Sequence, residues 1–403
     1  MSARADRLRL AVALEGAGWH PAAWREPAAR PAELFSPRYW ADLVTEAEAG
    51  LVDLVTLEDS LTLQTSDRFG DFGDDRTDHV RGRLDAVLVA ARVAPLTRHI
   101  GLLPTATVTH TEPFHVSKAI ATLDHVSRGR AGVHVQVAPR QRDAALIGRR
   151  TFAPVPNGDL DSPAGQLLLH DAFDEAADYV EVLRRLWDSW EDDAEIRDVA
   201  TGRFIDRDKL HHIDFEGRWF NVKGPSITPR PPQGQPVVAA LADRSIPHRL
   251  VGRSTDIGFV TPRGTGDIAP IVAEIREAQA SAGREGETVH VFGDLVVVLA
   301  ESEPAAHDRL AGLDEAAGAT YRSDARIFTG SAAELADLLA DWRAAGLTGV
   351  RLRPAVLPDD LQAITRRLVP ELQRRGLFHD HYEASTLRGL LGLPRPANRY
   401  ATA

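Results

Sequence analysis

The sequence predicts an α/β protein built as a (β/α)8 TIM barrel. Short runs rich in β-branched residues alternate with longer amphipathic stretches, which is typical of strand–helix units around a parallel sheet. Eight of the short runs are apolar enough to be covered on both faces, and eight is the strand number of this barrel. The predicted strands are Leu8–Leu14, Asp53–Leu57, Ile100–Thr107, Ala131–Val137, Pro236–Ala240, Asp256–Val260, Val289–Leu299 and Gly349–Leu352. We expect residues 1–403 to form one barrel domain.

The predicted helices carry start and stop signals. Ser36-Pro37 and Glu112-Pro113 place a proline in a first helical turn, where its missing N–H costs nothing. The clearest helix is predicted from about Asp171 to Glu191, because Val180, Leu183, Leu186 and Trp187 fall on one stripe. A last helix is expected to end at residues 374–376, with two arginines and a glycine cap.

Two segments interrupt the alternation. Residues 192–235 are polar and punctuated by proline and glycine, which predicts an insertion between the fourth helix and the fifth strand. Residues 65–77 are rich in aspartate and glycine and follow the second strand. Long barrel loops usually serve the active-site mouth at the carboxyl ends of the strands, so we expect both segments there, where they would set substrate specificity.

Composition excludes several classes of protein. The chain has 47 lysine and arginine against 58 aspartate and glutamate residues, a formal net charge of −11, which argues against nucleic-acid binding. It has no cysteine, so disulfides and thiolate metal sites are excluded. No apolar stretch of roughly 18 residues occurs, so we expect a cytoplasmic protein with no membrane partner.

Two local motifs are weak. His211-His212 and His379-x-His381 have metal-ligand spacing but no third ligand clustered near them, so surface histidines are favoured and no metal is predicted. The stretch Gly264–Ala269 matches a loose dinucleotide pattern, but it lies in the sixth unit and Pro270 follows at once. A glycine-rich turn is the favoured interpretation.

Polar residues at the ends of predicted strands are the better site candidates. His110 falls just beyond the third strand, where it is either an active-site residue or a histidine at a helix start. His134 and Gln136 alternate with valines in the fourth strand, so both lie on one face and either meet a ligand or form an internal hydrogen-bonding layer. Glu58 and Asp59 close the second strand, and only one of the two adjacent side chains can face the mouth.

Eight segments, in this order, resemble the bacterial-luciferase-like flavin monooxygenases, and within them the nitrilotriacetate and dibenzothiophene-sulfone monooxygenase branch. The resemblance runs from about Leu8 to Arg399. The segments are Ala23–Pro27, Asp53–Ser60, Glu112–Phe114, Leu123–Gly132, Leu186–Ala194, Phe215–Val222, Pro232–Val238 and Thr386–Pro396.

The resemblance implies a two-component enzyme with FMN at the mouth of the barrel. Reduced FMN would come from a separate NADH:FMN reductase and react with O2 to a flavin hydroperoxide, and one oxygen atom would enter a small organic substrate. The protein's task would be to exclude water and supply a proton donor. Members commonly pair, so a homodimer or homotetramer is expected.

The resemblance also implies site residues. Asp59 matches an aspartate expected near the flavin ring, and Thr107 matches a small hydroxyl residue after the third strand. Arg244 and Ser245 can substitute for hydroxyls in a phosphate-binding turn. The cofactor-binding candidates are therefore Asp59, Thr107, His134, Gln136, Arg244 and Ser245. As proton donors we name His110 and His134, since histidine exchanges protons near neutral pH.

Several positions depart from the family pattern. A tryptophan–asparagine pair is replaced by Val133-His134, a Thr-Ser pair by Val137-Ala138, and a tyrosine by Phe173, while the phosphate turn reads Leu241–Pro247. Two alternatives therefore stand beside the FMN monooxygenase. One is a deazaflavin-dependent oxidoreductase that transfers hydride, and the other is a non-catalytic, flavin-free paralogue.

Overall fold

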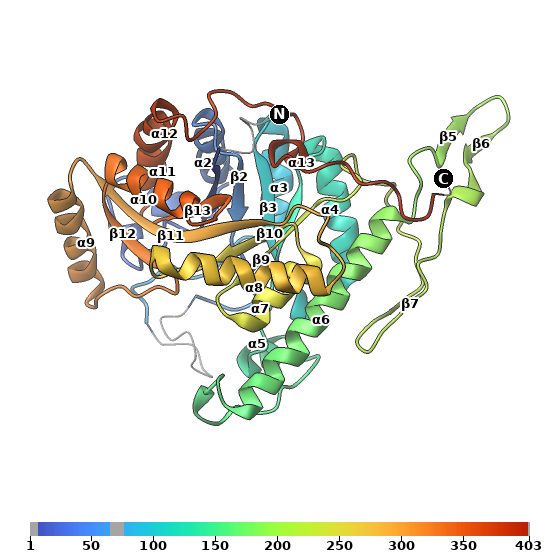
Figure 1. The fold of residues 1–403 in the computed structure, drawn as a ribbon, viewed down its shortest axis with the longest axis horizontal. Coiled ribbons are helices and arrows are strands. Elements are labelled where there is room, and N and C mark those ends of the chain that lie inside the picture. Colours follow the sequence, from blue (N-terminus) through green and yellow to red (C-terminus); the bar gives the residue numbers. More distant parts are fainter. Residues whose placement is uncertain (1–6, 65–75, 402–403) are drawn as a thin grey trace.

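Eight parallel strands close into a barrel in the computed structural model, which describes residues 7–64 and 76–401 (Figure 1). They follow one another around the barrel in chain order, and the pairing of β1 with β13 completes the ring. All eight predicted strands are present, which confirms the predicted fold class. The strands are β1 (Arg9–Leu14), β2 (Leu54–Leu57), β3 (Gly101–Thr107), β4 (Gly132–Gln136), β9 (Val237–Ala242), β10 (Ile257–Val260), β11 (His290–Ala300) and β13 (Gly349–Pro354).

Helices cover the outside of the barrel (Figure 1). The Ser36 hydroxyl accepts a hydrogen bond from the Arg38 backbone at the start of α2, and α4 begins at Pro113, as the proline signals predict. The helices are α2 (Pro37–Ala49), α3 (Ala86–Val93), α4 (Pro113–Ser127), α5 (Gln141–Ile147), α6 (Pro163–Asp188), α7 (Ser245–Ser254), α8 (Ile268–Ser281), α9 (Glu303–Ala317), α10 (Ala332–Ala344), α11 (Asp359–Ala363), α12 (Val369–Arg374) and α13 (Leu387–Leu390). Within the described residues, none is both long and apolar enough to cross a membrane.

The longest helix, α6, starts earlier than predicted. It begins at Pro163 rather than near Asp171, because the Ser162 hydroxyl caps the backbone N–H of Gly165. Phe173 consequently lies inside the helix and not at its start. The apolar stripe that identified the helix covers only its second half, which packs on the barrel.

The inside of the barrel has an apolar layer at the amino-terminal ends of the strands. It includes Leu54, Leu103, Ile257 and Phe292, and it is closed from below by Leu387 of α13. A Cβ atom on Gly101 would lie 2.5 Å from Leu387, so a glycine is needed where α13 meets β3. With this end plugged, ligands must enter at the carboxyl ends of the strands.

The insertion at 192–235 does not lie where we expected it. It connects the end of α6 to the start of β9, and a helix-to-strand connection in such a barrel lies at the amino-terminal ends of the strands, opposite the mouth. Arg230 pairs with Asp188 at the end of α6 and donates to the Pro396 carbonyl. The prediction that this segment sits at the mouth is therefore wrong. In the other predicted mouth segment, residues 65–75 lie outside the described part of the chain.

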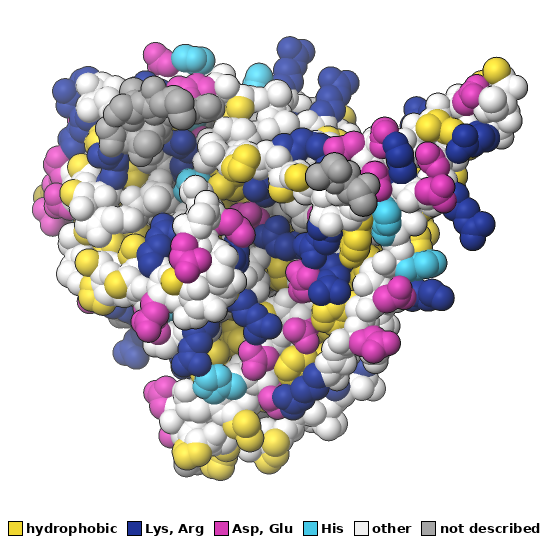
Figure 2. All heavy atoms as spheres, turned by 45° about the vertical axis from the view of Figure 1, so that its right-hand side comes forward, with side chains coloured by type: hydrophobic (Ala, Val, Ile, Leu, Met, Phe, Trp, Pro, Cys, Tyr) yellow, Lys and Arg dark blue, Asp and Glu magenta, His cyan; other side chains and the backbone are white. Residues whose placement is uncertain are grey.

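The insertion contains two hairpins. The first, β5 (Glu195–Asp198) with β6 (Arg203–Ile205), projects from the body, and Figure 2 shows hydrophobic side chains near its tip. Val199 and Phe204 are exposed there. The second, β7 (Phe215–Glu216) with β8 (Asn221–Val222), folds back along α6, where Phe220 packs on Tyr179.

Candidate active site

A buried charge network occupies the barrel above the apolar layer. Arg351 and Arg353 point inward from β13, and Asp294 points inward from β11. The Asp294 carboxylate pairs with both arginines, accepting from Arg351 Nε at 2.7 Å, and Arg353 also donates to Asp324 at 2.9 Å. Both guanidinium groups are fully buried, so Asp294 neutralises charge that water cannot reach.

Glu58 joins this network to β2. Its Oε1 accepts from the Thr56 hydroxyl at 2.8 Å and lies 3.3 Å from Arg351 Nη1. Its Oε2 lies 4.0 Å from Nδ1 of His134. Burial opposes ionisation of Glu58, but the charge of Arg351 and the hydrogen bond from Thr56 outweigh it and lower the pKa, so the carboxylate is charged at neutral pH.

His134 lies on the inner face of β4, as the alternation predicted. Its Nδ1 is 3.1 Å from the Thr105 hydroxyl, and its ring meets the edge of Phe259. Its Nε2 is buried with no hydrogen-bond partner in residues 7–64 and 76–401. Burial, with the charge of Arg351, lowers the pKa of His134 to about 4. The imidazole is thus neutral at pH 7 and can donate a hydrogen bond, and its role as a proton donor stays a prediction.

Thr107 and Gln136 lie two residues beyond Thr105 and His134 along β3 and β4, closer to the mouth. The Thr107 hydroxyl donates to Gln136 Oε1 at 3.0 Å, and the two residues are register partners in β3 and β4. The inner face of these strands therefore carries both a hydrogen-bonding layer and, at His134, a free nitrogen. A role of these residues in binding a cofactor stays a prediction.

His110 lies elsewhere on the mouth rim, in a single turn after β3. Its Nε2 is 3.1 Å from the Ala138 carbonyl, while its buried Nδ1 has no partner in the described residues. Burial lowers its pKa as well. The contacts of His110 are with the rim between β3 and β4, whereas those of His134 are with the interior network.

Asp59 does not share the interior with Glu58. Its Oδ2 accepts from the backbone N–H of Ala86, in the first turn of α3, at 2.9 Å, and its Oδ1 accepts from Ser60 at 2.7 Å. Because adjacent residues face opposite sides, the inward position belongs to Glu58. The expectation that Asp59 faces the barrel is corrected: its hydrogen bonds hold α3.

Replacing Asp59 with alanine is expected to lower the free energy of unfolding by about 1 kcal/mol, because the Ala86 N–H loses its acceptor. Urea denaturation measures this loss, and an FMN titration of the same variant is expected to show less than a threefold change. A tenfold weaker FMN affinity at unchanged stability would restore the cofactor role that the resemblance implied.

Arg244 and Ser245 lie after β9, at the start of α7. Arg244 Nε is 3.4 Å from Asp243 Oδ1, and its Nη1 is 3.8 Å from Asp161 Oδ1. Ser245 helps to lower the pKa of the Glu274 carboxyl of α8, which is hydrogen-bonded to His248. Two nearby carboxylates and a serine that already interacts with Glu274 make these residues weaker phosphate ligands than the sequence alone suggested.

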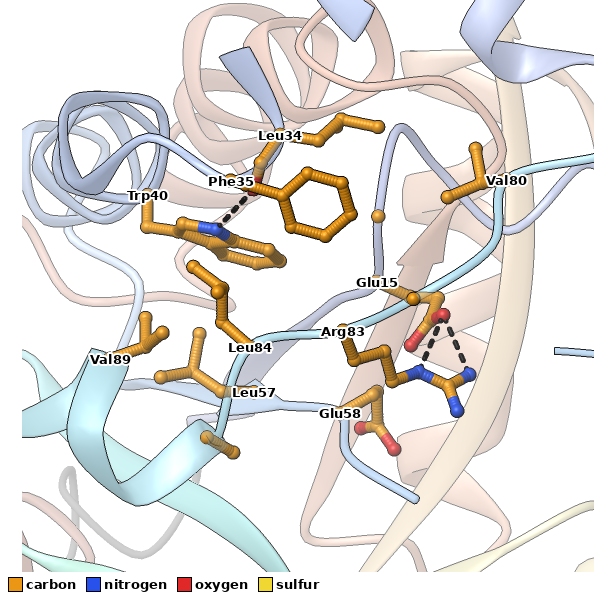
Figure 3. Close-up of a pocket in the computed structure, with 13 residues that line it drawn as sticks. Glu15, Leu34, Phe35, Trp40, Leu57, Glu58, Val80, Arg83, Leu84 and Val89 are labelled. Atoms are coloured by element: carbon orange, nitrogen blue, oxygen red, sulfur yellow. Dashed lines mark hydrogen bonds and ion pairs between the residues drawn. The ribbon is translucent and has the colours of Figure 1, made fainter. Parts of the chain in front are cut away.

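A pocket that the sequence did not predict lies beside the mouth, between the ends of β1 and β2. Glu15 and Arg83 form an ion pair of 2.8 Å, with Glu58 next to them, and an apolar wall faces them (Figure 3). Burial raises the pKa of Glu15 although Arg83 opposes this. The wall consists of Leu34, Phe35, Trp40, Leu57, Val80, Leu84 and Val89.

The buried state of His134 predicts a pH-dependent stability. Its pKa is about 4 in the folded chain and about 6.5 when unfolded, so between these values the unfolded chain binds more protons and stability falls as the pH falls. We expect His134 to lower the free energy of unfolding by about 2 kcal/mol between pH 7 and pH 5. We expect the free energy of unfolding of His134→Phe to fall by about 2 kcal/mol less than that of the original chain between pH 7 and pH 5, as measured by urea denaturation at both pH values. An unchanged pH dependence in the variant would contradict a neutral, buried His134.

Comparison with known proteins gives a consistent result. The model of the luciferase-like monooxygenase family matches residues 17–349. The N-acetyl-S-(2-succino)cysteine monooxygenase of Bacillus subtilis is 28% identical, with 100% of both chains covered. Nitrilotriacetate monooxygenase component A of Aminobacter aminovorans is also 28% identical, with 98% of each chain covered.

Solved structures share the fold. The EDTA monooxygenase of Chelativorans sp. BNC1 superposes with a TM-score of 0.79 at 22% identity, covering 96% of this chain and 99% of its own. The monooxygenase DmoA of Hyphomicrobium sulfonivorans reaches 0.82 at 22% identity, with 98% and 94% covered. The family match spans most of the chain and agrees with the resemblance read from eight short segments. The chain belongs to the luciferase-like monooxygenase family, a family of oxygenating enzymes.

Proposed function

We propose that this chain is a flavin-dependent monooxygenase that uses reduced FMN from a separate NADH-dependent reductase and inserts one atom of O2 into a small organic substrate. The observation that carries the proposal is the family match over residues 17–349. A relative that aligns over 98% of both chains is named as component A of its enzyme, which supports a separate partner that supplies reduced flavin.

The residues at the mouth fit a flavin nucleotide. A flavin ring is flat and rich in hydrogen-bond acceptors, and its phosphate is anionic. The described mouth offers one buried ring nitrogen without a partner on each of His134 and His110. Nε2 of His134 can donate, whereas Nδ1 of His110 accepts, because Nε2 of His110 donates to the Ala138 carbonyl. The side chains of Thr107 and Gln136 add further polar groups. When bound, reduced FMN supplies the electrons that activate O2.

The chain's own residues would then prepare the site. With Nδ1 accepting from the Thr105 hydroxyl, His134 carries its proton on Nε2 and donates from there, while the Glu58 carboxylate lies 4.0 Å from Nδ1. Arg351 keeps the Glu58 carboxylate charged and in place. The apolar layer and α13 close the lower end of the barrel, so water can be excluded once the mouth is filled.

The deciding experiment is an anaerobic titration with reduced FMN, followed by air. We expect saturable binding and a near-ultraviolet absorption band that outlives that of free flavin in air. If FMN does not bind, the same titration with a reduced deazaflavin tests the hydride-transfer alternative. If neither binds, the chain is a flavin-free paralogue and the proposal is wrong.

We further propose a cytoplasmic location, where NADH is available to the reductase, and a homodimer or homotetramer. The absence of cysteine in the sequence suits a reducing compartment. Analytical ultracentrifugation distinguishes the two oligomers from a monomer.

A further inference from the structure

A group of arginines follows β4 at the mouth rim. Arg140 donates from Nε to Asp143 Oδ2 at 2.9 Å, and Arg142 Nε lies 3.7 Å from Asp143 Oδ1. The Asp143 side chain is 2% exposed and the Arg142 side chain 10%. Two guanidinium groups therefore share one buried carboxylate, which leaves one positive charge in excess.

Arg142 is also short of hydrogen-bond partners. Its Nε and Nη1 are buried with no acceptor within hydrogen-bond distance in residues 7–64 and 76–401. A buried charged donor without an acceptor costs free energy, since water no longer solvates it. Such a donor set fits an anion that would complete it.

The arginine cluster lies at the carboxyl ends of the barrel strands. Residues 138–143 follow the carboxyl end of β4, and Thr109 and His110 follow that of β3. Thr109 accepts at its hydroxyl from the Ala138 N–H and at its carbonyl from Arg150 Nη1, and Arg150 in turn pairs with Glu175 of α6. These contacts tie the loop to the barrel mouth.

Hydroxyl groups that the family pattern places near this loop are missing. Positions 137 and 138 are valine and alanine, and Phe173 stands in place of a tyrosine. A guanidinium group is opposite in charge to a phosphate monoester dianion and can donate two parallel hydrogen bonds to it.

We propose that Arg142, held by Asp143, binds the terminal phosphate of the flavin nucleotide. This inference rests on the proposed function, because it assigns a residue to the cofactor of the same site. The positive charge of an arginine takes the place of neutral hydroxyls, so the chain keeps a phosphate site in spite of its departures from the family pattern.

Binding of oxidised FMN and of riboflavin, which lacks the phosphate, tests the assignment without any turnover. Fluorescence titration of Arg142→Gln is expected to show a dissociation constant for FMN raised about tenfold to a hundredfold. The riboflavin constant is expected to stay within twofold of the original chain. The matched control is Arg149→Gln in the same loop, because Arg149 is 62% exposed and pairs with Glu112; it is expected to change neither constant.

The outcomes separate this inference from the proposed function. Suppose that the original chain binds FMN, and that Arg142→Gln either weakens the binding of FMN and riboflavin equally or changes neither affinity. Arg142 then does not bind the phosphate, and the proposed function stands. If the original chain binds neither ligand, even when both are reduced under anaerobic conditions, both fail. Should Arg142→Gln not fold, Arg142→Lys keeps the charge but loses the paired donors, and a tenfold selective loss for FMN is expected. An equal change for both ligands would overturn the proposal.

Discussion

Asp294→Asn is expected to lower the free energy of unfolding by about 3–5 kcal/mol, the largest stability loss that we predict. The variant keeps the size of the side chain but removes the charge that two buried guanidinium groups share. Burial opposes the charge on Arg353, yet Asp294 and Asp324 more than compensate and raise its pKa, so the arginine stays charged. Without Asp294, that positive charge stays inside the barrel with too few partners. Urea denaturation of both chains at pH 7 measures the difference.

A surface carboxylate gives the matched control. Asp192 also pairs with two arginines, Arg230 and Arg395, but it is 52% exposed. After its neutralisation water solvates the half-exposed Arg395, and the buried Arg230 keeps Asp188 as a partner, so Asp192→Asn is expected to cost about 1 kcal/mol or less. Equal losses of unfolding free energy in the two variants would show that burial does not increase the contribution of the Asp294 carboxylate to stability.

The barrel strands could be predicted because their residues carry the signal locally. Each is an apolar run buried on both faces, and its observed ends fall within two residues of the prediction. The strand β12 (Arg326–Ser331) was missed because it adds to β11 outside the ring and is mostly half-buried, so it lacks such a run. The insertion was misplaced because its composition shows a loop but not which end of the barrel it leaves from.

Only part of the candidate site could be predicted from the sequence. Alternation alone places His134 and Gln136 on the inner face of β4. Arg351 meets Asp294 across 57 residues of sequence and Glu58 across 293, and no local pattern predicts such pairs. A signal did exist: Asp294 interrupts an apolar run, and Arg351 and Arg353 alternate with apolar residues in the last strand. Charged side chains at inward positions of a buried strand need partners of opposite charge. Only a few of the other strands carry such a residue, so the pairing could have been narrowed to those strands.

His134→Phe is expected to have the largest effect on turnover. Phenylalanine keeps a ring of similar size beside Phe259 but removes the free Nε2, which is the buried donor available at the centre of the site. Under the proposed function, a preorganised donor of this kind is worth about a hundredfold in rate. After air is admitted to the variant loaded with reduced FMN, hydrogen peroxide is expected to be released about 100-fold faster than from the original chain.

His290→Phe separates this role from a general effect of removing a buried histidine. His290 is also on an inner face, and burial likewise lowers its pKa to about 4, but its Nε2 is 2.9 Å from the Leu391 carbonyl at the plugged end of the barrel. That variant is expected to lose stability and to release peroxide at the original rate. If both variants release peroxide equally fast, the barrel's integrity rather than the His134 donor protects the reaction. If neither does, the interior network serves folding alone, and the proton must come from another group at the mouth, of which His110 is the first to test.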